Sequence, residues 1–447
     1  MRLLTRMNPP QVLASGMLAI ILAGALLLSM PQATASGERT PFLDALFTST
    51  SAVCVTGLTV YNTGGHFSLF GEIVLLALIQ VGGLGFMAMA TLIALVFRKR
   101  ISFRERLILQ QSMNQSSTEG IVRLIRKVLL YSLAIELMGA VLLTVHWMGE
   151  LPPGKAAYFG MFHSVSIFNN AGFELVSSLD HRPGGLMHYA ESPFFNVVSI
   201  ALIFLGGLGF IVIDDLLAYR RNRRLLLHSK VVLVFSGFLF LIGAVVILIF
   251  EYTNPMTFQP LTAAGKTFSA MFHSLSARSA GLSTVDVSAL RQATQFLLIL
   301  LMFIGAAPGS QGGGIKVTTF AILCGALYAM FRGKDDIVLF RNRIAPDRIH
   351  KAITFTFLTF FLVVAATTIL SVTEPFPFLG ILFEVTSAMA TTGLSMGLTS
   401  QLTDFGKTAI TLLMFIGRLG PVTLAFILVA GQRKELYRHP EGRIIIG

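Results

Sequence analysis

The chain of 447 residues is 54% hydrophobic and only 13% charged, with a mean hydropathy of +0.75 and a formal net charge of +12. A water-soluble domain of this length and composition would aggregate, so the sequence indicates a polytopic membrane protein. Its basic residues are spread over separate loops without a recognisable nucleic-acid-binding motif, so no nucleic acid is expected as a partner.

Eight apolar runs reach roughly the 20 residues that a helix needs to cross a bilayer of about 30 Å. They lie at 11–30, 70–97, 122–147, 193–219, 230–250, 294–330, 350–372 and 405–430. An even number of crossings places both termini on one side of the membrane. Of the 34 Lys and Arg residues, 25 lie in the tails and loops at 1–10, 98–127, 220–230, 332–351 and 431–447. Because basic loops stay inside, both termini are predicted to be cytoplasmic.

The first 36 residues have a second interpretation, as a cleavable secretory signal. Arg2 and Arg6 precede an apolar core, and ATASG follows at 33–37. The core of about 20 residues is longer than the usual 7 to 15 of a signal, and its removal would leave the first repeat one helix short. We therefore expect this segment to be retained as a crossing.

Four short segments between the crossings repeat one pattern, which opens with Phe, carries Ser or Thr near its middle and closes on Gly. They read FTSTSAVCVTGL at 47–58, FHSVSIFNNAGF at 162–173, FHSLSARSAGL at 272–282 and FEVTSAMATTGL at 383–394. The closing glycines are 115, 109 and 112 positions apart, and a second glycine feature follows each of them. The sequence thus predicts four tandem helix–pore-loop–helix units: 1–110, 111–228, 229–345 with a broken inner helix, and 346–447 with the C-terminal tail.

The stretch before each closing glycine is long enough for a short helix but too short to cross the membrane. Irregular backbone at membrane depth is tolerated only where it is buried in protein or lines water. Four such loops arranged pseudo-fourfold around one axis would line a pore, in which carbonyl rings replace the water of a monovalent cation. The predicted ion-binding residues are Val55, Thr56, Gly57, Asn170, Ala171, Gly172, Ser279, Ala280, Gly281, Thr391, Thr392 and Gly393. Ordinary turns between helices are the alternative, which four copies in register disfavour.

A glycine-rich stretch interrupts the second crossing of the third unit. Pro308 removes a backbone amide, and each Gly destabilises a helix by about 1 kcal/mol relative to Ala. We therefore expect the helix to break and a loop to protrude into the pore as a gate, whereas a packing kink is the alternative. The predicted gate residues are Gly305, Pro308, Gly309, Ser310, Gln311, Gly312, Gly313, Gly314, Lys316 and Arg418. Lys316 either holds this loop or extends its amine toward the membrane surface.

Arg418 places a charge in the middle of a crossing, which costs about 3 kcal/mol or more without water or a partner. We expect it to face the pore, and a buried ion pair with Glu136 is the alternative. Arg278 is expected to pack behind the filter, at the C-terminal end of its pore helix. His163 and His273 occupy matching repeat positions and are expected to be hydrogen-bonded in their helices and not to bind ions.

With these motifs the chain resembles the Trk, Ktr and HKT superfamily of potassium transporters, and within it the KtrB-type translocating subunits. The most specific marks are the four filter glycines, APGSQGGGIKVTTF at 307–320 and FIGRLGP at 415–421. The resemblance implies a multi-pass plasma-membrane protein that takes up K+ through the filter, with Arg418 anchoring the gate loop through backbone carbonyls. It also implies a homodimer on a cytosolic ring of KtrA-type nucleotide-binding regulators, no covalent cofactor, and Na+ as a candidate activator.

Three other functions fit the sequence less well. An HKT-like transporter that passes Na+ is the nearest alternative, but a Ser commonly replaces the first filter glycine there, and this chain has Gly57. A membrane-embedded enzyme would need a polar catalytic cluster at the midplane, and none is visible, so no enzymatic activity is expected. A secondary transporter with broken helices would show inverted repeats, whereas these four units all run in the same direction.

Overall fold

The computed structural model describes residues 9–85, 107, 121–179 and 184–420. The termini, most of the predicted cytoplasmic loop at 98–127 and the end of the FIGRLGP motif lie outside these residues. Within the described part, four helices are long and apolar enough to cross a membrane, or five if one bent pair counts as a single span. The four are α1 (Pro9–Leu28), α7 (Ile121–Trp147), α11 (Leu227–Glu251) and α15 (Pro346–Thr373). Each is the predicted first crossing of one repeat unit.

A short helix follows each long helix and packs against it. The short helices are α2 (Phe42–Cys54), α8 (Pro153–Phe168), α12 (Ala263–Ser279) and α16 (Phe378–Met389). The Phe that opens each repeat lies on them, and all four of these rings are fully buried. Burial of such a side chain stabilises the fold by about 1.5–3 kcal/mol, which explains why the pattern begins with Phe.

The first three helix pairs share one polar joint. A serine hydroxyl of the short helix donates to a carbonyl of the long helix, and a glycine one turn further along the long helix faces the same serine. The donor–acceptor pairs are Ser49 to Ile21 (2.7 Å), Ser164 to Glu136 (2.6 Å) and Ser274 to Phe240 (2.8 Å). Small residues allow two helices to approach closely, so this joint fixes each of these three short helices against its long helix.

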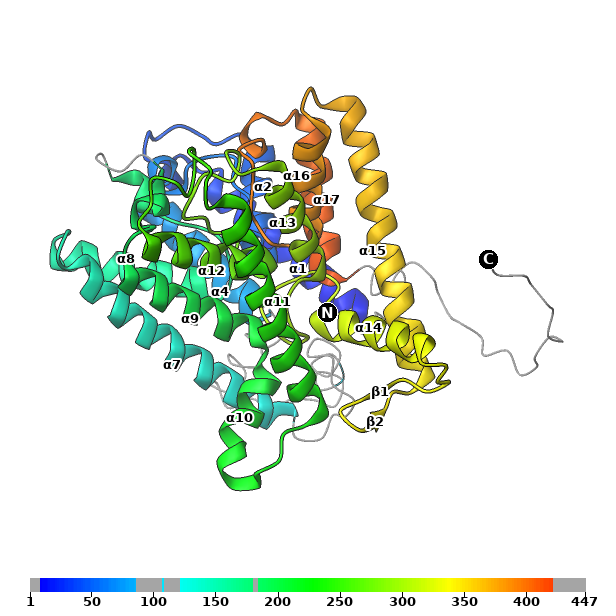
Figure 1. The fold of residues 1–447 in the computed structure, drawn as a ribbon. Coiled ribbons are helices and arrows are strands. Elements are labelled where there is room, and N and C mark those ends of the chain that lie inside the picture. The colour runs from blue at the N-terminus through cyan, green and yellow to red at the C-terminus, as the bar shows by residue number, and fades with distance from the viewer. Residues whose placement is uncertain (1–8, 86–106, 108–120, 180–183, 421–447) are drawn as a thin grey trace.

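Among the described residues, the second helix of each unit ends directly before a glycine, and the predicted parts of these crossings at 86–97 and 421–430 lie outside the described residues. These helices are α4 (Leu69–Leu84), α9 (Pro193–Leu208), α13 (Gln292–Ile304) and α17 (Asp404–Leu419). The break predicted for the third unit is present, and α14 (Val317–Phe331) follows it. The predicted crossing at 193–219 is not one straight helix, because α10 (Phe210–Asn222) is bent by 98° from α9 (Figure 1). Gly209 has a φ of +85°, which an α-helix cannot include.

The second helices connect the units in order. Helix α4 packs against α8, α9 against α12, α13 against α16, and α17 returns to α2. Helix α15 stands at one side of the assembly, beside α14 and a small antiparallel hairpin (Figure 1). The remaining elements are α3 (Thr63–His66), strands β1 (Val338–Leu339) and β2 (Asn342–Arg343), and the 3-10 turns η1 (Pro31–Ala33), η2 (Val176–Ser178), η3 (Gly185–Tyr189) and η4 (Thr399–Gln401).

A buried ion pair joins the last unit to the first. Lys407 Nζ of α17 lies 2.6 Å from Asp44 Oδ1 of α2, and the two side chains are only 12% and 8% exposed. The Tyr61 hydroxyl donates to the other carboxylate oxygen at 2.6 Å. Burial, and then the hydrogen bond to Asp44, raise the pKa of Tyr61 to about 12, so this hydroxyl remains a donor. The pair is separated by 363 positions in the chain.

We predict that Lys407→Met will destabilise the protein, because breaking a buried pair leaves a charge uncompensated and costs about 3–5 kcal/mol. The melting temperature of the detergent-purified protein should fall, and the double variant Asp44→Asn/Lys407→Met should recover part of the loss. Lys334→Met, at an exposed lysine, is the control. A wild-type melting temperature for Lys407→Met would contradict this account.

Candidate ion-binding site and gate

Each short helix passes directly into one of the four predicted filter segments. In three of them a residue without a glycine's freedom adopts positive φ: Val55 (55°), Asn170 (56°) and Thr391 (46°). A β-branched residue in this region is a true outlier, and such strain concentrates at functional sites. The third segment is one residue shorter, and Ser279 there still belongs to α12.

Four serines in register hold the backbone of these segments. These serines are part of the repeated Phe-to-Gly pattern, but no structural role was predicted for them. The bonded pairs are Gly57 N to Ser51 Oγ (3.0 Å), Phe173 N to Ser166 Oγ (3.1 Å), Ser276 Oγ to Leu282 O, and Gly393 N to Ser387 Oγ (3.0 Å). They lie six positions before the closing glycine in three units and five in the shorter third unit, and this spacing was the signal that could have identified them as supports of the predicted filter segments.

Three residues before these serines, side chains on three of the short helices hold the loop that follows the predicted filter segment. His163 Nε2 accepts from the amide of Leu175 at 3.1 Å, and His273 Nε2 lies 2.9 Å from Ser283 Oγ. In the fourth unit Glu384 takes this position and accepts from the Met396 amide at 3.1 Å. The two histidines are thus engaged in the hydrogen bonds expected of structural pore-helix residues.

The four closing glycines contact one another in the order of the units. A Cβ on Gly57 would lie 2.7 Å from Ala171 O, and a Cβ on Gly172 would lie 3.2 Å from Ala280 O. Substituents on Gly281 and Gly393 would likewise overlap the carbonyl oxygens of Thr392 and Thr56. Each segment therefore approaches the next so closely that a side chain at the closing position has no room.

The carbonyl oxygens of the twelve predicted ion-binding residues have no hydrogen-bond donor within the described part of the chain. Ten of these residues are buried, with only Gly172 and Gly281 partly exposed. The hydroxyls of Thr56, Thr391 and Thr392 are also buried without a described partner. Buried carbonyls are nearly always paired, so a set of orphaned oxygens gathered by four segments is suited to a cation.

The predicted gate loop connects α13 to α14 and is tied to the second unit by main-chain bonds. These run from Ala307 N to Gly207 O (3.1 Å), from Gln311 N to Gly206 O (3.2 Å) and from Phe210 N to Gly309 O (3.1 Å). The loop thus lies across the bend between α9 and α10. The break in the second unit and the break in the third unit therefore support one another.

The middle of the loop contacts two filter segments. A Cβ on Gly312 would lie 2.5 Å from Ser279 Cβ, and a Cβ on Gly313 would overlap Ala390 O and Thr391 Oγ1. The glycine run is therefore required by close approach, in addition to breaking the helix. It brings the predicted gate directly against the third and fourth segments of the predicted filter.

Two positively charged side chains, Arg418 and Lys316, donate hydrogen bonds to backbone carbonyl oxygens in and beside the predicted gate loop. Arg418 donates from Nη1 to Gln311 O and from Nη2 to Gly82 O, both at 2.6 Å, and Lys316 Nζ donates to Gly312 O at 2.5 Å. Arg418 therefore joins the loop to the first unit. The alternative partner, Glu136, instead accepts hydrogen bonds from Gln80 and Asn169, so no Arg418–Glu136 pair occurs among the described residues.

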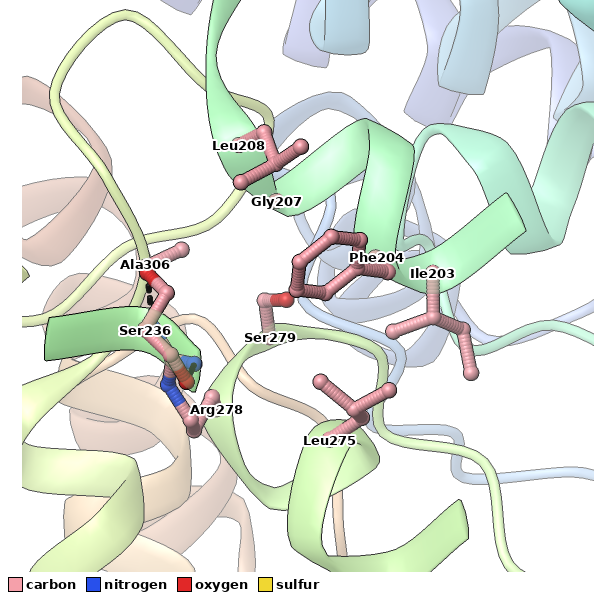
Figure 2. A pocket seen from close by; sticks show the side chains of 9 residues that line it. All are labelled: Ile203, Phe204, Gly207, Leu208, Ser236, Leu275, Arg278, Ser279 and Ala306. Atoms are coloured by element: carbon pink, nitrogen blue, oxygen red, sulfur yellow. Dashed lines mark hydrogen bonds between the residues drawn. The ribbon is translucent and has the colours of Figure 1, made fainter. Parts of the chain in front are cut away.

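Arg278 lies behind the third filter segment, where the sequence placed it. Its guanidinium donates from Nε to Gly305 O and from Nη1 and Nη2 to Ser236 O and Oγ, all at 3.2 Å. Figure 2 shows this side chain turned toward Ser236 on the wall of a small, mostly apolar pocket, with Ala306 and Ser279 nearby. Arg278 thus connects α11, the end of α12 and the start of the gate loop.

Comparison with known proteins identifies the family. Residues 9–435 match TrkH, described as a cation transport protein. The Ktr system potassium uptake protein B of Bacillus subtilis is 39% identical over 99% of this chain and 97% of its own length. The potassium/sodium uptake protein NtpJ of Enterococcus hirae is 40% identical over 100% of this chain and 99% of its own.

A solved structure supports the fold. The potassium transporter TrkH from Vibrio parahaemolyticus superposes with a TM-score of 0.69 at 18% identity, over 93% of this chain and 85% of that one. The family model and the relatives confirm the predicted superfamily, whose members perform membrane transport and not enzymatic chemistry. The chain belongs to the TrkH family of cation transport proteins.

Proposed function

We propose that this chain is the ion-conducting subunit of a K+ uptake system, with the four filter segments forming a selectivity filter around one pore. The observation that carries this proposal is the set of twelve filter carbonyl oxygens without described hydrogen-bond donors. An ion entering the filter loses water, and carbonyl dipoles compensate for that loss without any titratable group. The relatives named as potassium uptake proteins favour K+ as the transported ion.

The proposed architecture has four units arranged pseudo-fourfold and eight crossings. In each unit the long helix is the first crossing, and the second helix with the segment after its terminal glycine completes the second. The cyclic packing of α4, α9, α13 and α17 on the next short helix supports this arrangement. The C-terminal ends of the short helices precede the filter, where their partial negative charge favours cations.

The loop from Gly305 to Lys316 is the proposed gate. It contacts the third and fourth filter segments, and its backbone is bonded to the second unit and to Arg418. Lys316 and Arg418 add positive charge beside the path of a cation, which opposes its passage while the loop is in place. Opening then requires that the bond from Arg418 to Gln311 be exchanged for another.

The expected surroundings and partners extend the same proposal. We propose a multi-pass chain in the plasma membrane with both termini in the cytoplasm, an orientation that the basic loops support. The word "system" in the names of relatives fits a multi-component assembly, here proposed as a homodimer with a cytosolic KtrA-type nucleotide-binding ring. Nucleotide would then act only through that partner, and Na+ would be an activator or a minor permeant ion.

We predict that Gly57→Ser will lower the ratio of K+ to Na+ permeation. Gly57 has a φ of +95°, and its Cβ would lie 2.7 Å from Ala171 O and 2.8 Å from Gly172 Cα. The added side chain should displace the neighbouring carbonyls. If this changes the binding free energy of K+ relative to Na+ by about 1.4 kcal/mol, the permeation ratio changes about tenfold. Rubidium and sodium flux into proteoliposomes measures the ratio.

Gly37→Ser is the matched control, because Gly37 also has positive φ but nothing lies within 4 Å of its Cβ position. It should keep the wild-type ratio. Equal permeation of Na+ and K+ by the wild type would refute the proposed selectivity.

We predict that Arg418→Gln will increase rubidium flux while leaving the K+ to Na+ ratio unchanged. A hydrogen bond from a charged group contributes about 1.5–3 kcal/mol, so its loss should raise the open population about tenfold or more. Rubidium flux into proteoliposomes that contain no regulatory partner, measured at one rubidium concentration, reports this change. Arg291→Gln at the outer end of α13 is the control. Unchanged flux would show that Arg418 does not hold the loop closed.

A further inference from the structure

A buried polar cluster lies at the contact between the first and second units. It consists of Gln80 on α4, Glu136 on α7 and Asn169 at the end of α8. Gln80 Nε2 lies 3.1 and 3.0 Å from the two carboxylate oxygens of Glu136, and Asn169 Nδ2 lies 2.9 Å from Oε1. Asn169 Nδ2 also lies 3.1 Å from Gln80 Oε1. Glu136 is 2% exposed and Asn169 is fully buried.

The same positions of the repeat are mostly apolar in the other units. The serine joint places Ile21 and Phe240 where Glu136 stands, and the glycine feature places Phe204, Phe303 and Phe415 where Gln80 stands. Three positions before the closing glycine, Asn169 corresponds to Cys54, Arg278 and Ala390. This chain therefore builds comparable contacts from aromatic and aliphatic side chains. Packing alone does not require a carboxylate here.

A buried carboxylate is costly, but here Gln80 and Asn169 donate hydrogen bonds to its oxygens, and such bonds restrict the arrangement of the three side chains. A carboxylate only accepts hydrogen bonds. Gln80 and Asn169 therefore both present their NH2 groups to Glu136, and the NH2 group of Asn169 also donates to Val165 O of its own helix at 2.9 Å. Neither a glutamine nor an apolar residue at position 136 can impose this orientation.

The fixed amide belongs to the residue directly before the second filter segment. Asn169 ends α8, and Asn170 follows it with a φ of +56°. Gly83 of α4 packs so closely on Asn169 that a Cβ there would overlap its Oδ1. The neighbouring Gly82 carbonyl is the one that accepts from Arg418. The cluster thus connects a filter segment to the helix on which the proposed gate anchor rests.

We propose that Glu136 is a positioning residue for ion selection. Through Asn169 it sets the place of the Asn170 and Ala171 carbonyls in the ring, and through Gln80 it holds that segment against α4. The inference rests on the proposed filter and deepens it, because it makes one quarter of the ring depend on an anionic support that the repeat-related contacts do not have.

Two variants test the proposal. Glu136→Gln keeps the shape of the side chain but turns an acceptor into a donor, so it should lower the K+ to Na+ flux ratio about tenfold, as expected for the loss of a hydrogen bond to a charged group. The triple variant Gln80→Phe/Glu136→Ile/Asn169→Ala copies residues found in the other units. It should assemble with a melting temperature near that of the wild type and still have the lowered ratio.

Glu251→Gln is the matched control. Glu251 is also fully buried and accepts from Asn254 (2.6 Å), Thr257 (2.9 Å) and Thr294 (2.5 Å), but it lies at the end of α11 and contacts no filter segment in these bonds. Its substitution should lower the melting temperature and leave the ratio unchanged. A selectivity effect is thereby separated from a loss of stability.

A triple variant that assembles and keeps the wild-type ratio would overturn the proposal, and if it fails to assemble, an unchanged ratio for Glu136→Gln decides against it. Gly57→Ser, measured in parallel, distinguishes a wrong role for Glu136 from a wrong filter. If Gly57→Ser changes the ratio and the cluster variants do not, the filter stands and the role of Glu136 is wrong. A wild type that does not distinguish K+ from Na+ removes the filter itself.

Discussion

The constraint on which the rest of this structure depends is that main-chain oxygens of buried residues lack hydrogen-bond donors among the described residues. Such an arrangement costs free energy unless a ligand satisfies the oxygens. The surrounding structure holds it in place: the buried Phe side chains and serine joints fix the short helices, and four further serines hold the filter backbone. Strain at Val55 and Thr391 and the contact between closing glycines follow from the same requirement.

Departures from the repeat provide the second level of organisation. The units share the long helix, the short helix and the glycine that ends the second helix, and these shared parts account for the cyclic packing. The unshared residues are charged or polar: Arg418 stands where other units have Gly83, Gly207 and Ala306, and Glu136 stands among apolar counterparts. Repetition thus explains the proposed filter, whereas asymmetry explains the proposed gate and the support of the second segment.

Much of the fold and of the candidate site could be predicted from the sequence, because a tandem repeat makes equivalent residues comparable within one chain. The four filter segments, the break in the third unit and the isolated Arg418 were all predicted by residue number. The bend at Gly209 was missed because glycines are common in membrane helices, and nothing local tells a packing glycine from one with positive φ. The partners of buried side chains were also missed, since Lys407 and Asp44 are 363 positions apart and Gln80 and Glu136 are 56 apart.

The central claim concerns where a cation binds, and crystals grown with rubidium test it most directly. An anomalous difference map should show peaks between the four closing glycines, bounded by the carbonyl oxygens of the twelve filter residues, and these peaks should disappear when sodium replaces rubidium. Peaks located only at side-chain carboxylates, or a ring without any peak at saturating rubidium, would contradict the account.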